Sequence, residues 1–434
     1  MNVEIESDYI LKLHYGSDVH KLAMVMCRMD CSIYILVTDM PTDSSQIIET
    51  GLFIEGPLLR RIIENFEGRK DYTNNFISLN HKITSITRPY DGLFSRNADY
   101  YSITNHTGEV KTFHFIYHLL SFEADFENSR FLLEGIINDF TINLSTIEEK
   151  STRQVMIYDQ QGYCYSKKLD IEYNQQYNER DYTRFIDENN IICYDSDPYS
   201  YKLHILNLET GKTFDIDIDD ENTGKEKTEF YYEYIREIQF RQNHSLVAYT
   251  CDNPTYGCTG IRILKIDAGK PYAQNIFSFD AYDHKPLNLR EPDEVRETFL
   301  FLAIDINQTG QRAAVMRSAS KQNTDYSYST SYSIYIFNVQ DGKAPLKIID
   351  ACSDSSEFDF IYFLTDAVVV VRFYSVFSFY DIATGENIKN IPFKKFTGFH
   401  VSKNYLVYID NNSLCMVYVD KDGKVIKLDN PLRM

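Results

Sequence analysis

The stretch FSFYDIATGENIKNIPF, residues 377–393, contains two runs of alternating apolar residues joined by a polar turn around Gly385. Alternation with a period of two turns one face of a β-strand toward a core. Asp and Thr in the turn cap their own backbone, and glycine adopts the positive φ that a tight connection needs. The stretch therefore predicts an antiparallel β-hairpin.

The same pattern recurs along the chain, which predicts a repeat architecture. Seven hairpins have this form, and their turn glycines are Gly108, Gly162, Gly211, Gly269, Gly342, Gly385 and Gly423. Further short apolar runs precede the hairpins, for example AVVVVRF at 367–373. A repeat of about 40–60 residues with four strands is typical of a β-propeller blade.

We therefore expect an all-β fold, a seven-bladed β-propeller of four-stranded antiparallel blades, over residues 99–434. An irregular hairpin at 31–54 leaves eight blades as the alternative. Residues 1–98 form an N-terminal segment in which the strand at 8–16 is expected to pair with the last blade and close the ring. Apolar residues at helical spacing predict a short helix at 56–69.

Two polar stretches interrupt the repeats. Residues 280–298 contain two prolines, and residues 318–331 are rich in Ser, Thr and Tyr. Both compositions are typical of long loops, which are the parts of a rigid scaffold that commonly carry binding specificity.

The turns NLETGK at 207–212 and DIATGE at 381–386 resemble the outer hairpins of WD-repeat-like and quinoprotein-like β-propellers. The Asp-Gly-Lys turns at 341–343 and 422–424 resemble them as well. Asp195, Asp252 and Asp410 occupy a turn position where WD repeats often carry Asp. The resemblance implies the propeller fold and points to no single family. Since quinoprotein-like dehydrogenases use Trp around their cofactor and this chain has no Trp, we expect no quinone. We expect no other cofactor either, because no established cofactor-binding motif is present.

The charge and hydropathy of the chain argue against nucleic acids and membranes as binding partners. The 434 residues include 44 Lys and Arg against 63 Asp and Glu, which gives a net charge of −19. Nucleic acids require clustered positive charge, and the basic stretch Lys389–Lys395 is short. No run approaches the roughly 20 apolar residues that cross a bilayer, and the acidic N-terminus is unlike a secretory signal. These features predict a cytoplasmic protein that neither binds nucleic acid nor inserts into membranes.

We expect no catalytic, cofactor-binding or metal-binding residues, because no established motif for such a site is present. In the stretch 215–226, Asp215, Asp217, Asp219 and Glu226 match calcium-loop positions, but Asp220 stands where the bend requires Gly. We interpret it as a solvated acidic loop. His114 and His118 lie four residues apart, and two imidazoles do not complete a zinc site.

The eight cysteines are scattered over a large chain, which favours reduced, mostly buried thiols. A metal or redox role is the alternative for the pair Cys251/Cys258, whereas Cys27 and Cys31 have no second pair and no nearby His to complete a zinc site. Tyrosines cluster at Tyr199/Tyr201, Tyr231/Tyr232/Tyr234 and Tyr326/Tyr328/Tyr332. Such tyrosines are either anchors of a protein interface or ordinary strand residues.

The sequence as a whole predicts a non-catalytic scaffold that presents a rigid acidic surface and long loops to a protein or peptide partner. A basic surface is expected on the partner, because opposite charges attract over long range. Permanent membership of a larger complex is a variant of this hypothesis. The alternative is a propeller enzyme, a hydrolase or lyase, whose site gathers side chains from several blades in the central channel.

Overall fold

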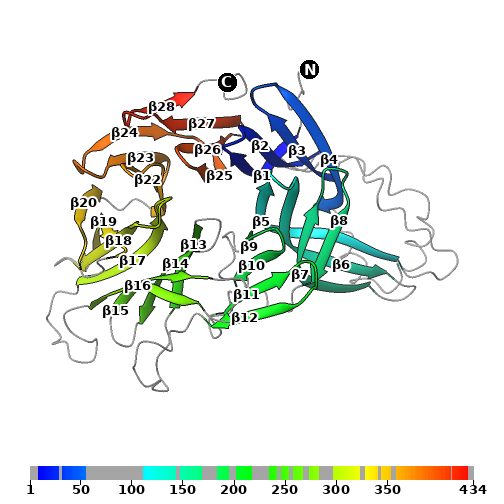
Figure 1. Ribbon diagram of the computed structural model, residues 1–434, viewed down its shortest axis with the longest axis horizontal. Coiled ribbons are helices and arrows are strands. Elements are labelled where there is room, and N and C mark those ends of the chain that lie inside the picture. The colour runs from blue at the N-terminus through cyan, green and yellow to red at the C-terminus, as the bar shows by residue number, and fades with distance from the viewer. Residues whose placement is uncertain are drawn as a thin grey trace. The chain divides into compact units, whose positions relative to one another are not determined.

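The computed structural model describes fifteen segments of the chain (Figure 1). They are residues 8–28, 32–54, 111–142, 147–168, 183–194, 202–217, 234–241, 246–253, 258–266, 273–282, 297–322, 328–340, 344–352, 358–411 and 413–428. All regular structure in these segments is β-strand, so they hold no helix that is long and apolar enough to cross a membrane. The helix predicted at 56–69 lies outside them.

The chain has the predicted fold class, an all-β, seven-bladed propeller of mostly four-stranded antiparallel blades. It divides into two compact units, residues 1–181 with 432–434 and residues 182–431. The first unit contains two blades that share one eight-stranded sheet, and the second contains five separate four-stranded sheets. Seven blades, and not the alternative of eight, are therefore present.

The first unit holds blades 1 and 2. Blade 1 consists of β1 (Tyr9–Gly16), β2 (Lys21–Cys27), β3 (Ser32–Asp39) and β4 (Ser44–Ile54). Blade 2 consists of β5 (Lys111–Asp125), β6 (Arg130–Ile142), β7 (Ile147–Tyr158) and β8 (Cys164–Lys168). A short parallel pairing of β4 with β5 joins the two blades.

The second unit holds blades 3 to 7. Blade 3 consists of β9 (Thr183–Phe185), β10 (Asn190–Tyr194), β11 (Lys202–Asn207) and β12 (Thr213–Asp217). Blade 4 consists of β13 (Tyr234–Arg241), β14 (Leu246–Asn253), β15 (Cys258–Lys265) and β16 (Gln274–Tyr282). Blade 5 consists of β17 (Glu297–Ile306), β18 (Arg312–Gln322), β19 (Tyr328–Asn338) and β20 (Lys347–Cys352). Blade 6 consists of β21 (Phe358–Phe363), β22 (Val368–Phe373), β23 (Val376–Asp381) and β24 (Asn387–Pro392). Blade 7 consists of β25 (Phe396–Ser402), β26 (Tyr405–Asp410), β27 (Ser413–Val419) and β28 (Val425–Leu428).

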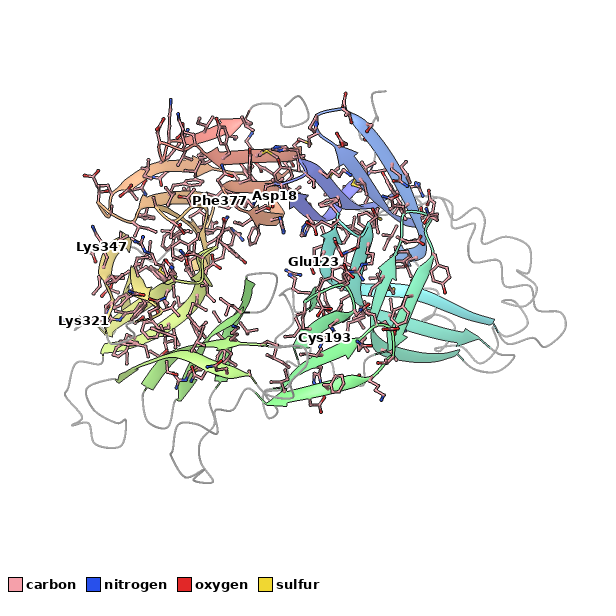
Figure 2. All side chains as sticks on the ribbon, viewed as in Figure 1. Asp18, Glu123, Cys193, Lys321, Lys347 and Phe377 are labelled. Carbon is pink, nitrogen blue, oxygen red and sulfur yellow. The ribbon has the colours of Figure 1, made fainter. Side chains whose placement is uncertain are left out.

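The apolar residues of each unit pack between neighbouring blades. A buried cluster that includes Ile35 and Leu133 joins blades 1 and 2. In the second unit, separate clusters join blades 3 and 4, 4 and 5, 5 and 6, and 6 and 7. Phe377, marked in Figure 2, lies fully buried in the last of these cores. The strands supply both faces of a blade with apolar side chains, so neighbouring sheets within one unit cover each other.

Four of the predicted turn glycines connect the third and fourth strands of their blades and adopt positive φ. They are Gly162, Gly211, Gly385 and Gly423, with φ between 66° and 83°. In each turn the residue that ends the third strand, or the one directly after it, caps the connection; Asp381 Oδ1, for example, accepts the Thr384 N–H at 2.6 Å. The local prediction is confirmed for these four turns, whereas Gly108, Gly269 and Gly342 lie outside the described residues.

The fourth strand of a blade also reaches the same turn region of the next blade. Gln46 on β4 donates to the Gln160 carbonyl at 2.9 Å, and Lys389 on β24 donates to the Val425 carbonyl at 3.0 Å. Lys347 on β20, which is labelled in Figure 2, donates to the Ala383 carbonyl in the turn between β23 and β24. The residues within each turn determine its conformation, and these contacts from the preceding blade fix its position.

Some details differ from the sequence predictions. The hairpin at 31–54 does not add an eighth blade, since it forms β3 and β4 of blade 1. The strand at 8–16 forms β1, which pairs with β2, and the described sheet of the last blade consists of β25–β28 alone. The predicted boundary between residues 98 and 99 lies outside the described residues.

The loop predicted at 318–331 is largely strand. Residues 318–322 end β18, residues 328–331 begin β19, and Gln322 lies opposite Tyr328. Thr and Tyr favour a pleated surface, and pairing with a long neighbouring strand outweighed the polar composition on which the prediction relied.

Candidate interaction surface

Two apolar rows run across the face of blade 5 that packs toward blade 4. In the first row, Val315 on β18 lies opposite Tyr335 on β19, which lies opposite Ile348 on β20. In the second, Ala313 lies opposite Phe337, and the Leu346 N–H donates to the adjoining Ile336 carbonyl at 2.7 Å. The inner residues of these rows belong to the core between blades 4 and 5.

The outer ends of the rows are exposed. Leu346 is 61% exposed and Ile348 is 50% exposed, whereas Ile349, on the opposite face of the same strand, is 2% exposed. Tyr335 is half-buried beside them and stacks on Phe337 with ring centroids 6.3 Å apart. Together Tyr335, Leu346, Ile348 and Asp350 form a continuous feature that we call the β20 surface.

The strand that carries this surface lies at the edge of its sheet. β20 ends the strand order of blade 5 and pairs with β19 (Figure 1). Edge strands usually carry charges or proline that discourage pairing with another chain. β24 in blade 6 follows that rule with Lys389 and Pro392, whereas β20 presents the exposed Ile348, and the exposed Leu346 lies directly before its first residue.

Charged groups border the β20 surface. Asp350 is exposed one alternation beyond Ile348, and Ser333 donates to its carboxylate at 3.5 Å. Arg317 donates to the Tyr335 hydroxyl at 3.0 Å, and its guanidinium lies 4.7 Å from the Phe299 ring centroid. The arginine is thus engaged in holding Tyr335, and the carboxylate of Asp350 faces solvent.

The backbone beneath the surface is well anchored. The Lys347 side chain does not cover the β20 surface, because it donates to the Ala383 carbonyl on the opposite side of the strand. Ile349 packs into the core between blades 5 and 6. Since the strand is already ordered, binding at this surface costs little conformational entropy.

Buried polar side chains in this unit serve to hold blades together. Asp305 is fully buried, and its Oδ2 accepts the Phe363 N–H of the next blade at 2.7 Å. Thr259 Oγ1 accepts the Phe301 N–H at 3.0 Å across the preceding blade boundary. Within the described ranges, no three His, Cys, Asp or Glu side chains are grouped so that they could hold a metal ion.

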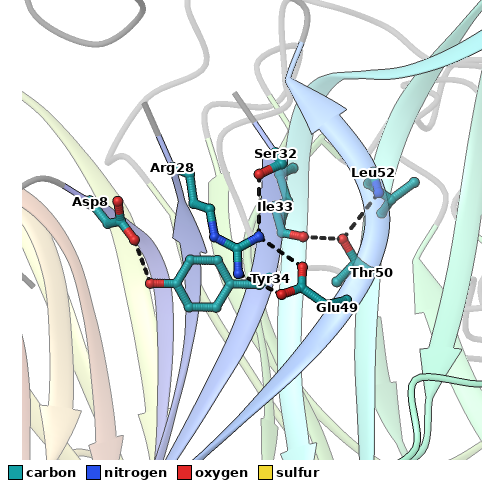
Figure 3. Close-up of polar contacts among 8 residues, drawn as sticks. All are labelled: Asp8, Arg28, Ser32, Ile33, Tyr34, Glu49, Thr50 and Leu52. Carbon is teal, nitrogen blue, oxygen red and sulfur yellow. Dashed lines mark hydrogen bonds and ion pairs between the residues drawn. The ribbon is translucent and has the colours of Figure 1, made fainter. Parts of the chain in front are cut away.

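Blade 1 carries a polar cluster at its strand ends (Figure 3). Arg28 makes a bidentate ion pair with Glu49, with N–O distances of 2.8 and 2.5 Å, and its guanidinium lies 4.3 Å from the Tyr34 ring centroid. Tyr34 donates to Asp8 at 2.7 Å, and burial together with this hydrogen bond raises the tyrosine pKa. Because Arg28 is engaged by both carboxylate oxygens of Glu49, we interpret the cluster as a structural contact that joins the strands of blade 1.

Only part of the acidic candidate site lies in the described chain. Asp215 and Asp217 belong to β12, while Asp219 and Glu226 lie outside the described residues. Asp215 Oδ1 lies 2.9 Å from Nδ1 of His204 on the adjacent strand, so this carboxylate pairs within the sheet. On β5, His114 lies opposite Asp139 and His118 opposite Ile136, with a register shift between them.

The strand pairing and ring contacts show how the candidate cysteines and tyrosines are used in the fold. Cys251 lies opposite Gly260 and Cys258 opposite Asn253, so these two residues are not cross-strand partners. Cys27 is buried and its thiol donates to the Arg28 carbonyl at 3.4 Å, and Cys31 lies outside the described residues. Tyr332, a member of the third tyrosine cluster, is half-buried and packs on the rings of Phe358 and Phe373. Its role is therefore in core packing.

The sequence analysis missed the β20 surface. The run PLKIID at 345–350 is typical of a strand, and nothing in it separates a buried isoleucine from an exposed one. Only the position of blade 4 decides that Phe337 is covered while Leu346 is not.

Comparison with known proteins identifies no family for this chain. No protein-family model matches the sequence, and no curated protein matches it. Among solved structures, the Pseudomonas aeruginosa periplasmic gluconolactonase is 9% identical, covers 97% of this chain and 94% of its own, and has a TM-score of 0.41. A Lactobacillus plantarum protein has the same identity and coverages with a TM-score of 0.40. Hsv2p of Kluyveromyces lactis is 11% identical over 73% of this chain and 100% of its own, with a TM-score of 0.38.

Proposed function

We propose that this protein is a non-catalytic interaction scaffold and that the β20 surface is a docking site for a protein or peptide partner. The observation that carries the proposal is the exposure of Leu346 and Ile348 at the ends of otherwise buried apolar rows. Two neighbouring exposed aliphatic side chains at the start of an ordered strand are the kind of feature that a partner covers.

The chemistry of the surface indicates the kind of partner. An extended segment with apolar side chains would cover Leu346 and Ile348, and its backbone would pair with the outer edge of β20. Asp350 beside them and the net charge of −19 favour a basic residue in that segment. The absence of a transmembrane-length apolar run in the sequence supports a cytoplasmic location as part of the same proposal.

The experiment is affinity capture with the full chain, followed by reconstitution with the purified partner. We expect a stoichiometric protein partner whose affinity falls about tenfold or more in the Leu346→Ser/Ile348→Ser variant, since truncating an anchor costs about 2 kcal/mol. Ile388→Ser is the matched control, because Ile388 is an exposed isoleucine on the neighbouring edge strand. A partner that binds both variants equally would refute the β20 surface as the docking site, and turnover of a substrate would refute the non-catalytic role.

A further inference from the structure

A second surface, separate from β20, lies where three connections of blades 6 and 7 meet. They are the β22–β23 turn, the β24–β25 connection and the β26–β27 turn. The Phe393 N–H donates to the Ser375 carbonyl at 2.9 Å, and the Asn411 N–H donates to the Lys395 carbonyl at 2.8 Å. These hydrogen bonds hold the three connections side by side.

The side chains presented there are basic and aromatic. Tyr374 is 70% exposed, and Lys394 and Lys395 are also exposed. Behind them, the Arg372 guanidinium lies 4.0 Å from the Phe396 ring centroid and 5.3 Å from that of Phe393. The set Arg372, Tyr374, Lys394 and Lys395 is named the Tyr374 surface.

The backbone at Tyr374 is in an unfavourable conformation. Its φ is 45°, in the left-handed region, which costs a residue with a Cβ about 1 kcal/mol. Gly or Asn is the usual occupant of such a turn position. A strained backbone at an exposed aromatic residue points to a role for the side chain itself, because the ring makes no contribution to the core.

The local charge is opposite to that of the whole protein. Arg372, Lys394 and Lys395 contribute three positive charges, and Asp410 is the carboxylate that binds this loop. Asp410 Oδ1 accepts the N–H groups of Lys394 and Lys395, each at 2.9 Å, so it is directed at the backbone. Both lysines are exposed, and each carries a positive charge on a flexible side chain.

We propose that the Tyr374 surface binds an acidic protein segment, in which Asp or Glu side chains pair with Lys394 and Lys395 and the chain packs on the Tyr374 ring. Charge complementarity selects this occupant. A nucleic acid would bring a continuous phosphate backbone against a protein of charge −19, whereas a short acidic segment places a few carboxylates on the positive patch alone. The proposal is independent of the β20 surface.

The test is fluorescence anisotropy of the full chain with a short labelled peptide of alternating Glu and Ser, at low and at physiological salt. We expect saturable binding that weakens with salt, because exposed ion pairs are screened. A peptide with Gln in place of Glu is expected not to bind. The Lys394→Ser/Lys395→Ser variant is expected to bind the Glu peptide about tenfold more weakly, as the loss of two ion pairs implies.

Two variants separate the surface from charge and stability in general. Lys421→Ser/Lys424→Ser removes two exposed lysines from the β27–β28 turn and is expected to leave binding unchanged. Tyr374→Asn suits the positive φ, so it is expected to keep the melting temperature while weakening binding. The proposal is overturned if the Glu peptide does not bind, if the two double variants lose affinity equally, or if a labelled oligonucleotide binds this surface more tightly than the peptide.

Discussion

Gly162 and Gly423 occupy the same turn in blades 2 and 7, yet their surroundings differ. Both have positive φ, 83° and 78°. A Cβ on Gly162 would lie 3.2 Å from the Glu49 carbonyl oxygen of the neighbouring blade, whereas a Cβ on Gly423 meets nothing within 4 Å. The two positions therefore separate backbone strain from crowding between blades.

We expect Gly423→Ala to lower the free energy of unfolding by about 1 kcal/mol, the cost of a left-handed alanine. Gly162→Ala is expected to lose roughly twice as much, because the oxygen it crowds belongs to backbone that is fixed in β4. Urea denaturation midpoints of the two variants provide the measurement. Equal losses would show that the turn of blade 2 is not pressed against blade 1.

Asp125 gives a prediction for pH. Burial by itself would raise the pKa of Asp125, but hydrogen bonds from Arg130, at 2.6 Å, and from Asn128 outweigh it and lower the pKa below its usual value. A carboxyl group whose pKa is lowered on folding stabilises the native state above its unfolded pKa of about 4, and this contribution is lost as the pH falls through the folded pKa.

Asp125→Asn is therefore expected to be less stable than the wild type at pH 7, and the difference is expected to shrink below about pH 4. Thermal melting of both proteins at a series of pH values tests the sign. A difference that stays constant down to acidic pH would contradict the assigned role of the carboxylate.

At the scale of a single element, β20 is the most informative strand, because two adjacent isoleucines lie on opposite faces. Ile348 is half exposed and Ile349 is 2% exposed. Ile348→Lys is expected to change the melting temperature little, as surface substitutions usually do. Ile349→Lys is expected to destabilise the protein strongly, since it places an unpaired charge in the core between blades 5 and 6.

Melting curves of the two lysine variants read out the register of β20 directly. Shifting a strand by one residue exchanges its two faces, so the opposite ranking of the two variants would contradict the pairing of Ile349 with Ile334. The same pair of variants also tests the premise of the proposed docking site, namely that Ile348 does not contribute to the core.

Local pattern predicted the strands and turns well, and long-range packing explains where it failed. The capped turns at Gly162, Gly211, Gly385 and Gly423 follow from residues within one hairpin. The assignment of 31–54 went wrong because a hairpin that lacks the glycine turn motif still forms the third and fourth strands of a blade. Strand pairing across many residues decides such cases.

At the scale of the whole molecule, net charge and local charge lead to different partners. The net charge of −19 predicted a partner with a basic surface, but a net charge does not show where on the protein positive side chains gather. The Tyr374 surface depends on hydrogen bonds that bring Ser375, Phe393 and Asn411 together from three connections. Residues far apart along the chain meet there, which a reading of sequence windows does not reveal.

The outer contacts between blades bear on how this protein tolerates added sequence. Lys347 and Gln46 each bind a carbonyl in or beside the β-turn of the following blade, so those turns support two sheets at once. An epitope tag grafted into the β7–β8 or β23–β24 turn is therefore expected to disturb the preceding blade as well as its own.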